Sequence, residues 1–88
     1  MKYKVGDKVR VKSLDWIEEN CEYDIILSCF IYKEEDVAFM ESMQKFCGQV
    51  VTICGVNDEA PPYYTIEGED TWIFVDWMLE EIGDENEV

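Results

Sequence analysis

The chain has 88 residues, and its 21 acidic residues outnumber seven lysines and arginines to give a formal net charge of −14. This charge argues against DNA or RNA as a direct ligand, because affinity for phosphates depends largely on cations that displace counterions. It disfavours an anionic membrane surface for the same reason. A chain of this length is expected to form one domain with a single core.

The basic residues are unevenly distributed. Residues 1–12 contain five lysines and arginines against one acid, Asp7, whereas the rest of the chain holds only Lys33 and Lys45 against twenty acids. The excess of carboxylates has two interpretations, which both remain open: it keeps the protein soluble, or it forms an acidic docking face.

The cysteines are expected to be free thiols. The N-terminal residues do not form a secretory signal, and no apolar run is long enough to span a bilayer, so we predict a cytoplasmic protein. The spacings between Cys21, Cys29, Cys47 and Cys54 contain no close pair, and the chain has no histidine. We therefore predict no metal and no cofactor.

The first third of the chain begins with a clear strand. Residues 4–12 alternate valines with basic residues, which is the period-two pattern of a strand with one wet face. Residues 13–20 predict a single helical turn with Ser13 or Asp15 as N-cap. Residues 21–36 contain an apolar run without clear periodicity, which we interpret as a moderately buried extended segment inside a long insertion.

A helix is predicted at about residues 36–47. Asp36 can cap its start, and Gly48 fits the position after its end. Phe39, Met43 and Phe46 recur at helical spacing and form an apolar stripe. Core packing and an adaptable methionine-rich binding groove are both possible roles for this stripe.

The second half of the chain predicts four more strands. They cover residues 49–56, 63–67, 72–75 and 79–82, with a proline-containing loop after the first and a helical turn at 76–78. Gly68 supplies the positive φ that the tight turn between the second and third of these strands requires. The neighbouring strands are expected to bury Ile66, Trp72 and Phe74, with Trp77 closing one end.

This pattern resembles an SH3-like small barrel over about residues 4–13 and 49–82. The segment Gly6-Asp7-x-Val9-x-Val11 is similar to the entry signature of several SH3-like families, including KOW domains. The chain also resembles small uncharacterised barrel proteins of bacteria and phages. The resemblance lies in Gly-x-Val-Val-x-Ile at residues 48–53 and in a later group formed by Trp72, Phe74, Met78, Leu79 and Glu80. The segments with which eukaryotic SH3 domains grip polyproline are absent.

The resemblance implies a mainly β fold: a five-stranded SH3-like barrel with the helix at 36–47 inserted between strands one and two. A single domain would then cover residues 1–83, with the insertion at about 14–48 and a frayed acidic tail at 84–88. KOW modules that touch RNA are usually basic, so the opposite sign of this chain outside its first strand argues against an RNA role.

We predict a non-enzymatic, monomeric interaction module that binds another protein, such as one with a basic surface. No nucleophile, phosphate loop or calcium motif is present. The SH3-like binding face would collect a group of acidic and aromatic residues: Asp58, Glu59, Tyr63, Glu69, Asp70 and Trp72. Two alternatives remain: an acidic mimic of nucleic acid that inhibits a DNA-binding enzyme, and a small ligand-binding or hydrolytic protein that uses carboxylates.

Overall fold

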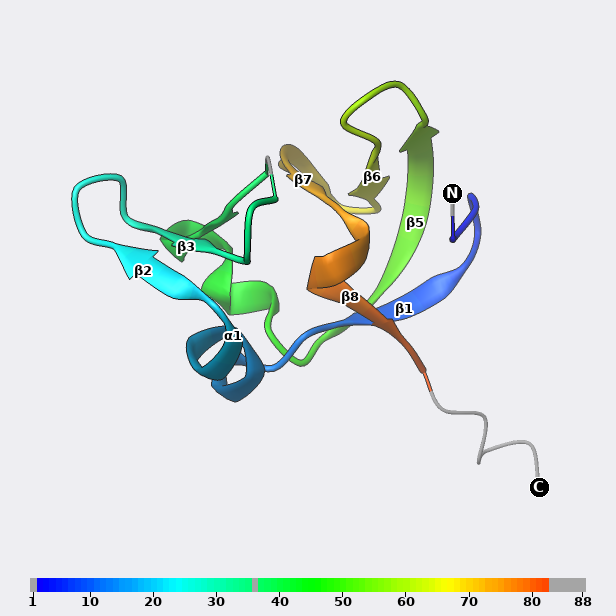
Figure 1. Ribbon diagram of the computed structural model, residues 1–88. Helices are drawn as coiled ribbons and strands as arrows, with labels where there is room; N and C mark the ends of the chain where they lie inside the picture. The colour runs from blue at the N-terminus through cyan, green and yellow to red at the C-terminus, as the bar shows by residue number, and fades with distance from the viewer. Residues whose placement is uncertain (1, 36, 83–88) are drawn as a thin grey trace.

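The structure is a computed structural model that describes residues 2–35 and 37–82. It contains two antiparallel sheets, one of five strands in the order β7-β6-β5-β1-β8 and one of three strands in the order β2-β3-β4 (Figure 1). The prediction of a mainly β fold with short helical segments is confirmed. The elements in chain order are β1 (Lys8–Val11), α1 (Leu14–Asn20), β2 (Glu22–Asp24), β3 (Cys29–Ile31), β4 (Phe39–Met40), η1 (Glu41–Phe46), β5 (Val50–Asn57), β6 (Tyr63–Ile66), β7 (Glu69–Phe74), η2 (Asp76–Met78) and β8 (Leu79–Glu81).

Strand β1 lies between β5 and the edge strand β8 of the five-stranded sheet. It pairs with β5 on one side and with β8 on the other, in the register Val9↔Val51 and Val9↔Glu81. Its alternating sequence buries Val9 and Val11 and leaves Lys8 exposed. The sheet is open, with β7 and β8 as its two edges, and closure of the predicted barrel is not observed in the described part of the chain.

The hairpin of β6 and β7 turns at Gly68, whose φ of +82° is the positive value that the turn was predicted to need. The register of β5 against β6 shifts between Ile53 and Gly55. A Cβ at residue 55 would lie 2.5 Å from Thr65 Oγ1 on β6, so the close approach of the two strands there favours glycine.

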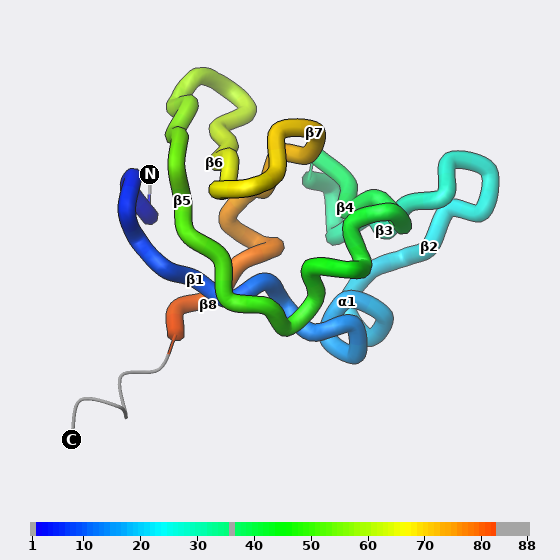
Figure 2. Tube along the Cα trace, turned by 180° about the vertical axis from the view of Figure 1, so that it is seen from behind, coloured from blue at the N-terminus to red at the C-terminus, as the bar shows by residue number. Residues whose placement is uncertain are grey.

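Residues 12–49 form an insertion that leaves and rejoins the five-stranded sheet at the same end (Figures 1 and 2). Val11 accepts a hydrogen bond from Gly48 N and donates one to Gln49 O, each 2.9 Å long. Helix α1 is capped by Ser13, whose hydroxyl accepts from Trp16 N at 3.1 Å, so Ser13 rather than Asp15 is the N-cap.

The predicted helix at 36–47 is only partly formed. Residue 36 lies outside the described residues, Phe39 and Met40 form β4, and the following residues form the 3₁₀ helix η1. Phe39 pairs with Phe30 of β3, and both rings are buried, so tertiary packing on β3 overrides the helical periodicity at this point. Gly48 follows η1 with a φ of +78°, as its predicted position after the helix requires.

The segment at 21–36 was predicted to be extended and moderately buried. Most of it forms the hairpin of β2 and β3, in the register Glu22↔Ile31 and Asp24↔Cys29. Cys29 and Phe30 are buried, whereas the residues between the two strands are exposed, so the prediction of burial is wrong for the hairpin turn. The predicted acidic tail at 84–88 lies outside the described residues.

The core combines side chains of the five-stranded sheet with side chains of the insertion. Ile66 and Phe74 are fully buried as predicted, whereas Trp72 is only half-buried and packs against the core cluster. The buried cluster consists of Tyr3, Val9, Val11, Ile17, Phe30, Phe39, Met43, Ile53, Tyr64, Ile66, Phe74, Val75, Met78 and Leu79.

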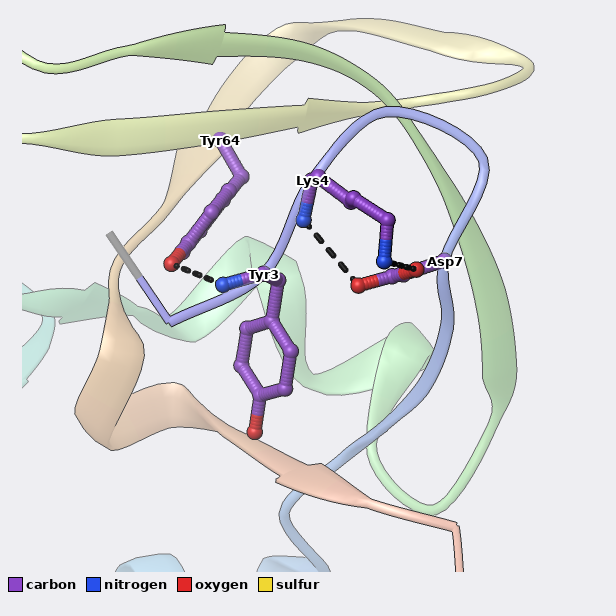
Figure 3. Close-up of polar contacts among 4 residues, drawn as sticks. All are labelled: Tyr3, Lys4, Asp7 and Tyr64. Atoms are coloured by element: carbon purple, nitrogen blue, oxygen red, sulfur yellow. Dashed lines mark hydrogen bonds and ion pairs between the residues drawn. The ribbon is translucent and has the colours of Figure 1, made fainter.

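Tyr64 ties the N-terminal segment to the core. Its hydroxyl accepts hydrogen bonds from the backbone N–H groups of Lys2 (3.1 Å) and Tyr3 (3.0 Å), and it donates to Asp76 Oδ1 at 2.6 Å. Figure 3 shows the contact with Tyr3 beside the turn in which Asp7 accepts from Lys4. The N-terminal residues are therefore held by long-range hydrogen bonds.

An aromatic stack attaches the insertion to η2. Tyr32 lies against Trp77 with ring centroids 4.9 Å apart, and Trp16 of α1 is 5.4 Å from Tyr32 and 6.3 Å from Trp77. Lys12 Nζ lies 3.7 Å from the centroid of the Trp16 ring and donates to the carbonyl of Trp77. Trp77 is half-buried and contacts the insertion as well as the end of the sheet.

Candidate functional site

The six predicted binding residues do not form one cluster. Asp58 and Glu59 are exposed in the loop between β5 and β6, where the Glu59 N–H donates to Asn57 Oδ1. Tyr63 pairs with Asn57 at the same end of β6 and is half-buried against the core. These three residues lie together.

The other three predicted residues belong to β7. Glu69 pairs with Ile66, at the opposite end of β6 from Tyr63, and three strand residues span about 10 Å. Glu69 Oε2 accepts from Thr71 N, and Asp70 is exposed beside it. Trp72 is half-buried and packs on the core. The structure therefore separates Glu69 and Asp70 from the loop acids by the length of β6.

The turn of the β2–β3 hairpin carries a different surface feature, three consecutive exposed aliphatic side chains. Ile25, Ile26 and Leu27 are 80%, 88% and 61% exposed. We call these three residues the apolar tip. Exposed apolar residues are ordinary when scattered, but a consecutive run on a surface is a feature of interaction sites.

Hydrogen bonds hold the apolar tip in a defined shape. Asp24 Oδ1 accepts from the N–H groups of Ile26 (2.9 Å) and Leu27 (3.1 Å), which is an Asx-type turn. Ser28 has a φ of +56° and closes the turn, and its carbonyl accepts from Glu41 N at 2.9 Å. The tip is thus preorganised, which reduces the conformational entropy lost when a partner covers it.

An open groove of about 400 Å³ lies beside the base of the hairpin. Tyr23 and Phe30 provide aromatic surface, with ring centroids 4.9 Å apart. The Tyr23 hydroxyl donates to Glu41 Oε1 at 2.9 Å. The groove is lined by residues of the insertion alone: Glu18, Cys21, Tyr23, Phe30, Glu41 and Gln44. We call it the insertion groove.

The groove is acidic, and neither Tyr23 nor Cys21 is poised to act as a nucleophile near neutral pH. The hydrogen bond to Glu41 raises the pKa of Tyr23, so its phenol stays protonated and continues to donate near neutral pH. Burial raises the pKa of the Cys21 thiol, which disfavours the nucleophilic thiolate. Within residues 2–35 and 37–82 the one ion pair joins Lys4 and Asp7, so neither glutamate of the groove is neutralised by a salt bridge there.

All four cysteines are free in the structure, and Cys54 is exposed. We expect titration of the unfolded, unreduced protein to find four thiols, and elemental analysis to find no bound zinc, because no close cysteine pair is present. Fewer than three reactive thiols, or stoichiometric zinc, would contradict this prediction.

The described residues contain no group of three or more cysteine or carboxylate side chains placed to hold a metal ion. Among them, no helix has both the length and the apolar character needed to cross a membrane.

The prediction from sequence missed the apolar tip and the insertion groove. The run from Ile25 to Tyr32 was treated as one extended segment, although Asp24 is a residue type that initiates turns through its side chain. Met43, part of the alternative methionine-rich groove, belongs to η1 and is fully buried, which confirms core packing for this residue.

No family model matches this chain, and neither a curated protein nor a solved structure matches it.

Proposed function

We propose that this protein is an acidic interaction module that binds another protein through the apolar tip. The observation that carries the proposal is the consecutive exposure of Ile25, Ile26 and Leu27 on a turn fixed by Asp24. Fully burying one such aliphatic side chain contributes about 1.5–3 kcal/mol, so three neighbouring side chains provide a substantial apolar anchor.

The surroundings of the tip favour a partner with an apolar pocket and a basic rim. Glu22 and Asp24 precede the tip on β2, and Glu41 lies at its base through the hydrogen bond to Ser28. Carboxylates around an apolar anchor steer a positively charged surface toward it and repel an acidic one.

An SH3-like small barrel is the fold that we propose for the five-stranded sheet. Its support is the strand order β7-β6-β5-β1-β8, the long insertion after β1, and the 3₁₀ turn η2 directly before the last strand. In this arrangement the apolar tip belongs to the insertion, and the loop that holds Asp58 and Glu59 belongs to the body of the sheet.

The tip can be tested by capture of a partner from the native host. Ile25→Ser with Ile26→Ser is expected to leave folding nearly unchanged, since both side chains are exposed. Loss of the anchor is expected to weaken capture at least about tenfold. The matched control is Val50→Ser with Val56→Ser, which removes two exposed aliphatic side chains from β5 and is expected to bind normally.

Two outcomes would contradict the proposal. Equal loss of capture in the tip and control variants would show that the tip is not the anchor. A wild-type dimer that the tip variant converts to a monomer would show that a second copy covers the tip.

The high negative charge supports a second candidate, an acidic mimic of nucleic acid. A mimic is expected to bind a basic DNA-binding enzyme with a steep loss of affinity as salt rises. The affinity of a mimic for that enzyme would also be unchanged by the serine substitutions at the tip. Measuring capture by the tip variant at low and high salt therefore separates the two candidates.

A further inference from the structure

We propose that the insertion groove receives an arginine side chain of the protein partner. This inference rests on the proposed function, because it assigns the chemistry of the partner residue that lies next to the apolar tip. None of the six binding residues predicted from sequence lines the insertion groove.

The groove and the apolar tip are both built on the β2–β3 hairpin. Tyr23 is in β2, one residue before Asp24, and Glu41 N donates to Ser28 O at the end of the turn. A partner that covers Ile26 and Leu27 therefore also comes within reach of the groove. The two features would be occupied together.

Two walls of the groove carry carboxylates. Glu18 projects from α1 and Glu41 begins η1, and both line the same open space. Glu41 accepts from the Tyr23 hydroxyl with one oxygen, which orients the carboxylate and leaves its other oxygen available. Since neither glutamate has a salt bridge within residues 2–35 and 37–82, a cation from outside would be the first to neutralise them.

Arginine fits this lining better than lysine. Its planar guanidinium stacks on aromatic rings and donates several hydrogen bonds in a fixed fork, and the groove is lined by two aromatic residues, two glutamates and Gln44. A lysine ammonium is compact and strongly hydrated, so it gains less from an aromatic surface. The volume of about 400 Å³ lies within the range of about 300–1,000 Å³ that is common for ligand pockets.

The probe for this inference is the short blocked peptide acetyl-Gly-Arg-Gly-amide, titrated into the whole protein and followed by NMR. We expect saturable shifts at the Glu41 backbone amide and the Gln44 side-chain amide. A peptide with citrulline, which has nearly the same shape but no charge, is expected to produce no saturable shift. The corresponding lysine peptide is expected to bind more weakly than the arginine peptide.

Charge removal provides the matched comparison. Glu18→Gln and Glu41→Gln are each expected to weaken binding about 1.4- to 5-fold, the effect of one exposed ion pair, and together about 2- to 25-fold. The control Asp58→Asn with Glu59→Gln removes the same charge from the distant β5–β6 loop and is expected to leave the affinity nearly unchanged. An equal loss in the control, or equal binding of the lysine or citrulline peptide, would overturn the inference.

The tip variant separates this inference from the proposed function. Ile25→Ser with Ile26→Ser is expected to bind the arginine peptide normally while losing the protein partner. If the tip variant keeps the partner, the proposed function fails. If the tip variant loses the partner but neither the wild-type protein nor the tip variant binds the arginine peptide, only the assignment of the groove fails.

Discussion

The buried hydroxyl of Tyr64 connects three segments that lie far apart in the sequence. It accepts from the N–H groups of Lys2 and Tyr3 and donates to Asp76 at the start of η2. The N–H of Tyr3 is buried, so it depends on this phenol for a hydrogen-bond partner. One side chain on β6 thus anchors the N-terminal segment to both the sheet and the 3₁₀ turn.

Replacement of Tyr64 by phenylalanine tests this anchor. The variant leaves backbone donors unsatisfied, and we expect it to lower the free energy of unfolding by about 1–3 kcal/mol. Urea denaturation would measure the loss. Tyr63→Phe on the same strand is the matched control, because its hydroxyl makes no hydrogen bond in the described part of the chain. Equal stability of the two variants would show that the anchor contributes little.

Stability is expected to fall in alkaline solution. Burial raises the pKa of Tyr64 above its ordinary value and raises that of Tyr3 to about 12. The folded state therefore keeps protons that the unfolded state releases above pH 10, so the stabilisation is complete below about pH 10 and is lost as pH rises toward 12.

Urea unfolding at successive pH values would measure this decline, which reaches at most about 1.4 kcal/mol per pH unit for each retained proton. Tyr3→Phe is expected to reduce the slope between about pH 10 and 12. Burial, partial at Cys21 and Cys47, also raises the pKa values of the Cys21, Cys29 and Cys47 thiols, which act in the same direction from a lower pH. Constant stability from pH 9 to 12 would contradict the prediction.

At the scale of elements, the strands were predictable and the insertion was only partly so. The alternation around Val9 and Val11 and the β-branched run of β5 specify strands locally. The turn at Gly68 and the helical turn of η2 also have local signals. By contrast, β4 forms because Phe39 pairs with Phe30 of β3. The sequence around Phe39 alone does not indicate this pairing.

The candidate site shows the same limit. Exposure of the apolar tip depends on how the β2–β3 hairpin projects from the rest of the chain, which apolar composition cannot reveal. The acidic and aromatic residues around Tyr63 and Glu69 were grouped by the expected fold, but the length of β6 separates them. The groove is formed by α1, β2, β3 and η1, and its residues become neighbours only after the insertion has packed.

Trp77 provides a test of how the insertion is attached. Trp77→Ala removes the ring that stacks on Tyr32 and Trp16, and we expect a loss of about 3 kcal/mol, the lower end for a buried tryptophan because the ring is half-exposed. Thermal unfolding would measure it, and hydrogen exchange should show the largest loss of protection in the insertion.

Trp77→Phe is the control for this experiment. It keeps an aromatic ring in the stack and removes the indole Nε1, which is buried without a hydrogen-bond partner among the described residues. We expect it to cost much less than alanine, since the phenyl ring still stacks and the unsatisfied indole N–H is removed. A melting temperature of Trp77→Ala within a few degrees of wild type would show that the stack is dispensable.

For the whole molecule, repulsion between carboxylates is expected to dominate the electrostatics. Arg10 lies opposite Glu80 on β8, but its guanidinium donates to the carbonyl of Gly48, and Lys8 donates to the hydroxyl of Thr52. These cations therefore form hydrogen bonds with uncharged groups. Strands β1 and β8 are neighbours in the sheet, but no ion pair joins them among the described residues.

Sodium chloride is therefore expected to raise the melting temperature. Screening shortens the range of repulsion from about 30 Å at 0.01 M salt to about 8 Å at 0.15 M. Each 1 kcal/mol of repulsion relieved should raise the melting temperature by about 4–8 °C in a domain of this size. Calorimetry at increasing salt measures the effect, and Asp58→Asn with Glu59→Gln should show a smaller rise. A clear fall with salt would mean that attractive pairs dominate.

The place of β1 also determines how the chain folds. Val9 pairs with Val51 and Glu81, which are 42 and 72 residues away, so this strand cannot find its neighbours until two large loops have closed. Sheets built from such distant pairings are typical of chains that fold in milliseconds to seconds. The β2–β3 hairpin closes over only four residues, and hairpins form in about 1–10 μs. The apolar tip is therefore presented to neighbouring molecules while β1 of the larger sheet is still unpaired.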